Sequence, residues 1–491
     1  MVKWFFLCNN RLAYVNVKMS NSMLNMKLKL ILLLLIFSSH LSVLNLRAQN
    51  VASLRSSTIS YEVLDLKTGE IVASHNPMQC ATPASITKLI TTATALELLG
   101  GDFQFSTYIE TNGTIEKGIL DGDLIIRGGA DPTLGSIHLG DRAFLDYFVK
   151  VIKHKGINHI TGNVIIDPTC LDRCPASVKW IWEDMGFHYG AAAFGLSAFD
   201  NTSIITMNSG EFGTKPIVTS VWPETPNLAI YNEVKTLAIP KDSVWAFCQP
   251  LGLALYLQGG MPANRNNYVV RTSIPNPSLV VAKSLYTMLN NWGIQIDGNY
   301  SVQTEYFPEQ RTLIHEYKSR KLREIIRLTN FKSNNLYAEH TFRRLGNIIM
   351  PHEATSSASI QVIKNYWEKQ GIDVSALFLY DGCGLAAQNA YSANFLNQIL
   401  AYMRKSPNWD DFYQSLPRAG REGTVGSFLY RTKLQDKARL KSGSLSGVQC
   451  YSGYIMYDEK EYAVTVMVNN FTCKRRDVKN QIEEWLLELV K

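Results

Sequence analysis

The strands predicted at the two ends of this chain constrain its fold more than any other feature, because a sheet built from both sets brings the two ends together. Near the N-terminus, residues 60–66 and 71–74 are predicted to form a hairpin around a short polar turn. Near the C-terminus the pattern predicts three strands and a final helix, at residues 438–445, 452–457, 462–469 and 477–490. A sheet of this kind with helices packed on it is an α+β layered fold.

The stretch between these ends has a helical part and a β-rich part. A helix is predicted over residues 85–99; it is apolar on most faces, which indicates burial, and it stops at Gly100-Gly101. From residue 105 to 275, short alternating segments separated by Gly, Asn, Asp and Pro predict mostly strands, with one helix near 143–155. Helices then return at 277–292, 325–345 and 362–370.

These changes of pattern predict a discontinuous domain that is interrupted by an insertion. The main domain comprises residues 49–104 and 276–491, and residues 105–275 form one or more β-rich inserted domains. A length of 491 residues is enough for two or three domains. The contents of 46% hydrophobic and 19% charged residues are typical of packed globular proteins.

The N-terminal segment has the features of a secretory signal. Met26-Lys27-Leu28-Lys29 is a basic stretch that leads into the apolar run 30–37, and this run is short for a membrane span. Ala48 is a small residue at a candidate cleavage point. We therefore predict residues 1–48 as a signal peptide, with Met26 as the candidate true start. The mature protein is then exported to the periplasm, with at most peripheral membrane contact.

Charge, histidine and cysteine contents exclude several classes of function. The net charge of +7 is too mild to indicate nucleic-acid binding, although it would suit an anionic polymer as substrate. The nine histidines are scattered and no Cys-x-x-Cys pair is present, so we predict no metal site and no cofactor. Cys170 and Cys174 are close enough in sequence to bridge in an oxidising compartment, but the disulfide pattern stays open.

Ser85-Ile86-Thr87-Lys88 carries the first candidate catalytic pair. A serine and a lysine three positions apart on a helix share one face. The serine hydroxyl becomes a nucleophile when a base takes its proton, and a lysine can be that base where burial keeps it neutral. The helix N-terminus also places backbone N–H groups near Ser85, which suits an oxyanion. Because the S-x-x-K pattern is common by chance, its significance depends on further motifs.

Acyl enzymes with such a Ser–Lys pair also need a K-[TS]-G element and an S-x-N element. Lys67-Thr68-Gly69 matches the first pattern literally, but it precedes the nucleophile and lies in a predicted hairpin turn. Lys441-Ser442-Gly443-Ser444 lies in a predicted strand, whose edge can offer backbone N–H groups and small hydroxyls. Gly443 would let a substrate backbone approach closely. We therefore assign the K-[TS]-G role to Lys441.

Three segments match the S-x-N pattern. Ser406-Pro407-Asn408 contains a proline, which suits a packed polar loop poorly, and Ser392 in Ser392-Ala393-Asn394 is more simply a helix N-cap. Ser333-Asn334-Asn335 lies between two predicted helices. There Ser333 can act as a proton shuttle, and Asn335 can direct its amide toward a substrate.

The order of these elements, Ser85-x-x-Lys88, Ser333-x-Asn335 and Lys441-Ser442-Gly443, resembles that of the penicillin-recognising serine enzymes. The long insertion directly after the first element is similar to that of class C low-molecular-mass penicillin-binding proteins. Those are D-Ala-D-Ala carboxypeptidases and endopeptidases of the bacterial periplasm. The segments that carry this similarity follow in order along the chain: Asp121-Gly122-Asp123-Leu124, residues 128–134, Gly162-Asn163-Val164, Tyr189-Gly190-Ala191, Asp200-Asn201, residues 381–385, residues 416–420 and Gly423-Thr424.

The resemblance implies a β-lactamase-like peptidase domain, with an antiparallel sheet flanked by helices, and it implies roles for the motif residues. Ser85 would attack the carbonyl between two D-alanines, with Lys88 as the acylation base and Ser333 as part of the proton relay to the leaving amine. Peptidoglycan peptides would be the substrates, and β-lactam antibiotics would be covalent inhibitors. The residues that would hold the substrate are Asn335, Lys441, Ser442, Gly443 and Ser444.

Three positions depart from the family pattern. The family usually has threonine at Ser442, where the hydroxyl is kept. It usually has serine at Cys383 and Ala386, and we predict that these two are structural positions. A β-lactamase would carry the same motifs, but it needs neither the insertion nor this size. A catalytically silent wall-binding scaffold is disfavoured by the intact Ser85 and Lys88. The preference between carboxypeptidase and endopeptidase action, the diamino acid of the stem peptide, the oligomeric state and the role of the insertion stay open.

Overall fold

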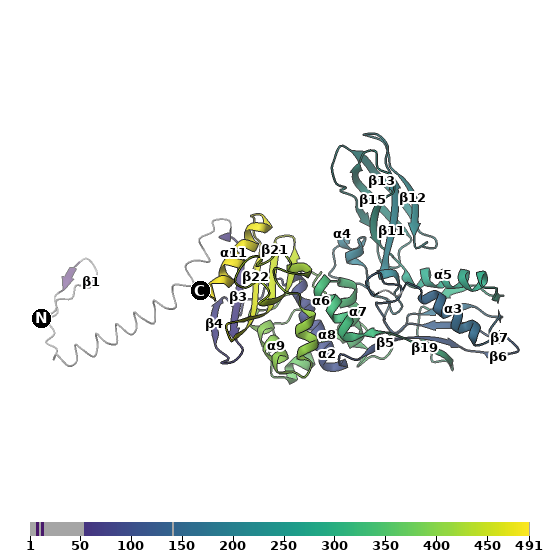
Figure 1. Ribbon diagram of the computed structural model, residues 1–491, viewed down its shortest axis with the longest axis horizontal. Helices are drawn as coiled ribbons and strands as arrows, with labels where there is room; N and C mark the ends of the chain where they lie inside the picture. Colours follow the sequence, from purple (N-terminus) through teal and green to yellow (C-terminus); the bar gives the residue numbers. More distant parts are fainter. Residues whose placement is uncertain (1–5, 9–10, 14–53, 140–141, 491) are drawn as a thin grey trace. The chain divides into compact units, whose positions relative to one another are not determined.

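The computed structural model describes residues 6–8, 11–13, 54–139 and 142–490 (Figure 1). The chain divides into two units, Met1–Ser56 and Ser57–Lys491. In the first unit, strands β1 (Phe6–Cys8) and β2 (Arg11–Ala13) pair in antiparallel register. The predicted signal peptide falls almost entirely outside the described residues, and so does its cleavage point.

The second unit contains the sheet that was predicted from the two ends of the chain. Five strands lie in the order β20-β21-β22-β3-β4 and are antiparallel throughout. The two ends meet where β3 pairs with β22, with Val63 opposite Val464. The bounds are β3 Thr58–Asp65, β4 Ile71–His75, β20 Ala438–Leu445, β21 Val448–Tyr457 and β22 Lys460–Asn469.

Helices pack against this sheet and enclose a continuous hydrophobic core (Figure 1). Helix α2 is buried from Lys88 to Leu96, as its apolar sequence predicted. Helix α9 lies on β22 and β3, while α11 contacts β21. The bounds are α2 Lys88–Leu99, α6 Leu322–Lys332, α7 Asn335–Gly346, α8 Ser356–Lys369, α9 Ala393–Lys405, α10 Trp409–Ser415 and α11 Arg475–Glu488.

The first part of the insertion is a mixed sheet covered by two helices. Its strands follow the order β18-β10-β8-β5-β19, a smaller sheet has the order β17-β9-β7-β6, and α3 and α5 pack on a shared core. The bounds are α3 Phe144–His154, α5 Pro277–Asn291, β5 Gln104–Thr111, β6 Thr114–Glu116, β7 Ile119–Asp121, β8 Leu124–Arg127, β9 His159–Ile160, β10 Val164–Asp167, β17 Gln295–Ile296, β18 Tyr300–Val302 and β19 Thr312–Lys321.

The second part of the insertion consists of two small sheets around a separate core. One has the order β12-β11-β16 and the other β13-β15-β14. Short helices α4 (Trp182–Met185), η3 (His188–Gly190) and η4 (Phe199–Asn201) lead into it. The strands are β11 Thr202–Asn208, β12 Ile217–Trp222, β13 Ala229–Leu237, β14 Trp245–Phe247, β15 Ala254–Pro262 and β16 Tyr268–Ser273.

The insertion ends later in the chain than the sequence indicated. Helix α5 contributes Val281, Leu285 and Leu289 to the inserted core, and β19 pairs with β5 in the inserted sheet. Residues 277–321 therefore group with the insertion by packing, which places its end near Lys321 and not at residue 275. The helical pattern that returns at 277 identified a helix, but it did not show which core the helix joins.

Cys170 and Cys174, the pair considered for a disulfide, are both free thiols. No helix in the described part of the chain is long and apolar enough to cross a bilayer.

Candidate active site

Ser85 lies in a tight turn that β20 holds in place. The turn is the short helix η2 (Ala84–Thr87), and it continues directly into α2. Ala84 has a φ of +49°, a left-handed conformation that is uncommon for a residue with a side chain. A Cβ added to Gly443 would lie 2.5 Å from the Pro83 carbonyl oxygen and 3.0 Å from the Ser85 nitrogen. Glycine is therefore required at 443 for β20 to pack against the serine turn, whatever the substrate needs.

The amine of Lys88 has three polar neighbours. Its Nζ lies 2.9 Å from Ser85 Oγ, 2.7 Å from Asn335 Oδ1 and 2.6 Å from the Cys383 carbonyl oxygen. A neutral amine has two N–H donors and one lone pair. The amide oxygen of Asn335 and the Cys383 carbonyl can only accept, so they take the two donors. The lone pair then faces the hydroxyl of Ser85, which is the arrangement a base requires.

Burial favours the neutral form of both lysines in the site. Desolvation by burial lowers the pKa of Lys88 from its usual 10.5, and the nearby acidic groups Asp381, Cys383 and Glu339 oppose this shift without cancelling it. Lys441 is also fully buried, and burial together with the charge of Lys88 lowers its pKa well below 10.5. The two cations also disfavour each other, so the site favours at least one neutral lysine.

Ser333 joins the site through the junction between α6 and α7. It ends α6 in the left-handed conformation, with a φ of 56°, and the next residue, Asn334, caps α7 by accepting a hydrogen bond from the Tyr337 N–H. Ser333 Oγ accepts a hydrogen bond of 2.8 Å from Lys441 Nζ, which also donates to the Ser442 carbonyl. The predicted S-x-N and K-S-G elements therefore meet directly.

Asn335 connects the site to the insertion. Its Oδ1 accepts from Lys88, and its Nδ2 donates to the carbonyl oxygen of Tyr189 in η3, at 2.8 Å. Among the described residues, only Tyr189 accepts an N–H of this amide, so the second N–H can serve a ligand. The insertion thus fixes the orientation of a residue that we predicted to hold the substrate.

The remaining predicted residues lie along β20. Ser442 Oγ donates to Thr424 Oγ1 at 2.8 Å, and the exposed Ser444 donates to Gln449 Oε1 at 2.9 Å. Lys88 therefore contacts both Ser85 and Asn335, and Lys441 contacts Ser333. Gly443 packs against the serine turn. Ser442 and Ser444 lie beside Gly443 on the same strand.

The rejected motif matches lie elsewhere. Lys67 and Gly69 belong to the turn between β3 and β4, where Asp65 accepts the Lys67 N–H. Ser392 is an N-cap, as predicted, because its hydroxyl accepts the N–H of Phe395. Ser406 donates to Glu97, so neither serine contacts the lysines of the site.

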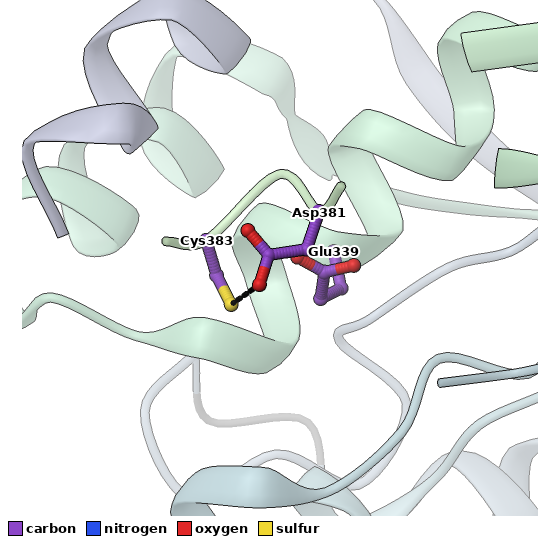
Figure 2. Close-up of side chains that lie close together, drawn as sticks. All are labelled: Glu339, Asp381 and Cys383. Carbon is purple, nitrogen blue, oxygen red and sulfur yellow. Dashed lines mark hydrogen bonds between the residues drawn. The ribbon is translucent and has the colours of Figure 1, made fainter. Parts of the chain in front are cut away.

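The sequence reasoning missed an acidic cluster behind Lys88. Glu339, Asp381 and Cys383 are buried and lie together, and Cys383 Sγ donates to Asp381 Oδ2 at 3.8 Å (Figure 2). Glu339 accepts the Gly382 N–H at 2.7 Å. It stands four residues after Asn335 on α7, so helical spacing was a signal that could have found it. The cluster holds the 381–384 loop, whose Cys383 carbonyl, and not its thiol, contacts Lys88.

These three side chains could in principle ligate a metal ion, since their donor atoms lie within 4.8 Å of one another. The contacts argue against that use. Asp381 already accepts four N–H groups, from the Trp180 indole, the Gly384 and Ala386 backbones and the Asn389 amide. Burial and the charge of Asp381 raise the pKa of Glu339 to about 8, so it is protonated at neutral pH. We assign the cluster a structural role.

Replacing Glu339 with glutamine should make the protein relatively more stable as pH rises. The folded-state pKa of about 8 exceeds the usual 4.5, so folding must keep a proton on Glu339 that the unfolded chain loses above pH 4.5. The stability advantage of Glu339→Gln should grow by up to about 1.4 kcal/mol per pH unit between these values and then level off. Denaturant unfolding of both proteins from pH 5 to 9 measures it. A constant difference would contradict a neutral buried acid.

Serine enzymes whose base is a lysine, and whose nucleophile faces an S-x-N and a K-S-G element, form the penicillin-recognising class. The antiparallel sheet and the contacts of Ser85, Lys88 and Lys441 place the chain in this class. More narrowly, it belongs to the D-Ala-D-Ala carboxypeptidase 3 (S13) family, whose model matches residues 42–489. The chain is thus a serine-type D-Ala-D-Ala carboxypeptidase, as its motifs predicted.

Known relatives support this assignment over most of the chain. A D-alanyl-D-alanine carboxypeptidase, DacB, from Haemophilus influenzae is 23% identical over 81% of this chain and 82% of its own length. A D-alanyl-D-alanine carboxypeptidase from Actinomadura sp. is 25% identical over 83% and 77%. The crystal structure of penicillin binding protein 4 from H. influenzae matches with a TM-score of 0.81 at 23% identity, covering 90% of this chain and 99% of that one. The predicted fold class is thereby confirmed.

Proposed function

We propose that Ser85 forms a covalent acyl-enzyme with D-alanine-terminated peptides of peptidoglycan, and that Lys88 activates it. The observation that carries this proposal is the set of contacts around Lys88 Nζ, which directs the lone pair of a neutral amine at Ser85 Oγ. β-Lactams would acylate the same hydroxyl. A structure of the H. influenzae protein in complex with a β-lactam, with a TM-score of 0.77 at 22% identity, supports this extension.

In the acylation step Ser85 Oγ bonds to the carbonyl carbon between the two D-alanines, and its proton passes to Lys88 Nζ. The tetrahedral oxyanion is stabilised by backbone N–H groups, for which the nitrogens of Ser85 and Ser444 are the candidates. The intermediate then breaks its C–N bond, so the terminal D-alanine leaves as an amine.

The leaving amine needs a proton, and the Ser333–Lys441 pair supplies the route. Ser333 Oγ gives its proton to the amine and recovers one from the protonated form of Lys441, whose Nζ lies 2.8 Å away. The proton that Ser85 gave to Lys88 balances the one that Lys441 supplies. Lys441, with the hydroxyls of Ser442 and Ser444, also provides the polar surface for the terminal carboxylate. Water then hydrolyses the ester on Ser85 and regenerates the enzyme without a cofactor.

Export to the periplasm completes the proposal, because peptidoglycan lies outside the cytoplasm. The basic stretch before residue 30 and the apolar run that follows support a cleaved signal peptide.

Purified protein incubated with pentapeptide monomers and with cross-linked dimers tests the proposed function. We expect D-alanine release from the monomer, cleavage of the dimer, or both, and product analysis assigns the preference between carboxypeptidase and endopeptidase action. Rapid turnover of penicillin without release of D-alanine would instead indicate a β-lactamase. A protein that neither cleaves peptides nor acquires a penicillin label would be a silent scaffold.

The kcat/KM for a pentapeptide should rise with pH around a midpoint below 10.5, the usual pKa of a lysine. The active form has Lys88 neutral, and burial lowers its pKa, so the proton is lost at a lower pH than from an exposed lysine. Because Lys88 and Lys441 influence each other, the midpoint belongs to the pair. A pH–rate profile measures it, and a rise centred near 10.5 would contradict a buried lysine base.

A further inference from the structure

The sheet β13-β15-β14, in the second part of the insertion, has aromatic side chains on its outer face (strands β13 and β15 are labelled in Figure 1). Tyr231 on β13 is the register partner of Tyr256 on β15, and Phe247 on β14 is the partner of Tyr256 on its other side. Residues paired in this way point to the same face of a sheet. Trp245, two positions before Phe247, lies on that face as well. We call these four residues the aromatic face.

The fold does not need the aromatic face for its core. The opposite face of the same strands fills the core of this part of the insertion, where Ala246 and Leu257 are fully buried. In contrast, Tyr231 is 50% exposed, Tyr256 is 43% exposed and Trp245 is 41% exposed. The solvated face of a sheet normally carries polar residues, so exposed rings on three adjacent strands indicate a binding surface.

The exposed rings offer flat apolar faces together with free polar groups. The rings of Tyr231 and Tyr256 stack with their centroids 4.8 Å apart, so their exposed area belongs to the outward faces and the edges. No hydrogen bond among the described residues uses either tyrosine hydroxyl or the Trp245 indole N–H. The amide of Gln258, the register partner of Trp245, is equally unused within this part of the chain. A matching ligand has a flat face of C–H groups and polar groups at its edge.

Charged side chains alternate in sign beside the aromatic face. Glu233 and Lys235 follow Tyr231 on the outer side of β13, and Glu233 forms an ion pair of 3.4 Å with Lys215. Surfaces that bind anionic lipids carry clusters of about four or more lysines and arginines. The alternating charges therefore favour a neutral ligand over a lipid surface.

The aromatic face is connected by side-chain contacts to the proposed active site. The ring of Trp245 packs edge-on against Phe187, with centroids 5.7 Å apart, and Phe187 stacks on Tyr189 at 5.4 Å. The carbonyl oxygen of Tyr189 accepts the amide N–H of Asn335, whose Oδ1 contacts Lys88. A ligand on the aromatic face would therefore lie on the same continuous structure that holds the site, as a polymeric substrate requires.

We infer that the aromatic face binds the glycan strand of peptidoglycan, a chain of N-acetylated pyranose sugars. The C–H bonds on the face of a pyranose carry partial positive charge and pack against the negative faces of aromatic rings. Its hydroxyl and acetamido groups can bond to the free tyrosine hydroxyls, the Trp245 indole and the Gln258 amide. This inference rests on the proposed function for the identity of the polymer, and it assigns recognition of the sugar chain to the insertion.

Glycan strands from which an amidase has removed all stem peptides test binding apart from catalysis. We expect the wild-type protein to bind them in isothermal titration calorimetry. The double variant Tyr231→Ala/Tyr256→Ala should bind about tenfold more weakly or worse, because both ring contacts are lost. A thermal melt shows whether this variant is folded. Tyr231→Ala alone, on the edge strand of the sheet, should weaken binding in the same direction with the smallest disturbance.

Tyr430→Ala is the matched control, since Tyr430 is 53% exposed, like Tyr231, but lies outside the insertion. It should bind glycan strands as tightly as the wild-type protein. Equal binding by the wild-type protein and the folded double variant, or no binding by the wild-type protein, would overturn the inference. So would binding of the wild-type protein to phosphatidylglycerol vesicles, but not to glycan strands, if the double variant loses it.

Failure of the proposed function gives a different result from failure of this inference. The probe carries no peptide, so its binding does not depend on catalysis. A protein that binds glycan strands through Tyr231 and Tyr256 while Ser85 acquires no penicillin label would contradict the proposed function alone. A protein that is labelled at Ser85 but does not bind the strands would contradict the inference alone.

Discussion

Ser85→Ala should abolish peptide cleavage and covalent labelling by penicillin, while the protein stays folded. Without the hydroxyl no acyl-enzyme can form, so kcat should fall by roughly four to six orders of magnitude, as for other serine hydrolases that lose their nucleophile. Folding should survive because Ser85 is only half-buried and its hydroxyl contacts the amine of Lys88. Gel fluorescence after incubation with a labelled penicillin, together with assays of D-alanine release, measures both effects.

Ser392→Ala is the control for this experiment. Ser392 also belongs to an S-x-N match, but its hydroxyl caps α9. Its loss should cost about 1 kcal/mol of stability and leave the penicillin label unchanged. Undiminished labelling of Ser85→Ala would show that another residue is acylated, and the assignment of the nucleophile would be wrong.

The parts of this site that the sequence predicted are those set by local spacing. Ser85 and Lys88 are three residues apart, so the backbone alone brings them to one face, and the contact of 2.9 Å agrees with this. Strand context also separated Lys441 from Lys67, because a turn cannot offer a strand edge. The pairing of β3 with β22 followed from the need of each strand for a partner.

The contacts that could not be predicted join segments far apart in sequence. The Asn335 amide meets the Tyr189 carbonyl, and the Trp180 indole meets Asp381. Neither contact has a local signal, since it depends on how the insertion packs against α7. The end of the insertion was placed too early for the same reason. The periodicity of α5 shows that it has an apolar face, but the choice between two cores is made by tertiary packing.

Lys88→Met should slow acylation by about two to four orders of magnitude, the usual contribution of a general base. Methionine is similar in length to lysine and suits a buried site, but it leaves Asn335 Oδ1 and the Cys383 carbonyl without their donor. Some stability is therefore lost as well, about 1–3 kcal/mol for each buried acceptor left unpaired. A thermal melt shows whether the variant is folded at the assay temperature, and the rate constant for penicillin acylation measures the loss of the base.

Lys67→Met provides the comparison, since Lys67 belongs to the literal K-T-G match and is exposed in the β3–β4 turn. It should acylate at the wild-type rate. The decisive readout is the pH dependence of the residual rate in Lys88→Met. If Lys88 is the base whose deprotonation limits the wild-type rate, that rise with pH should disappear from the variant. A variant that reacts slowly but keeps the wild-type pH profile would assign the proton transfer to Lys441, the other buried lysine, whose pKa is also lowered by burial.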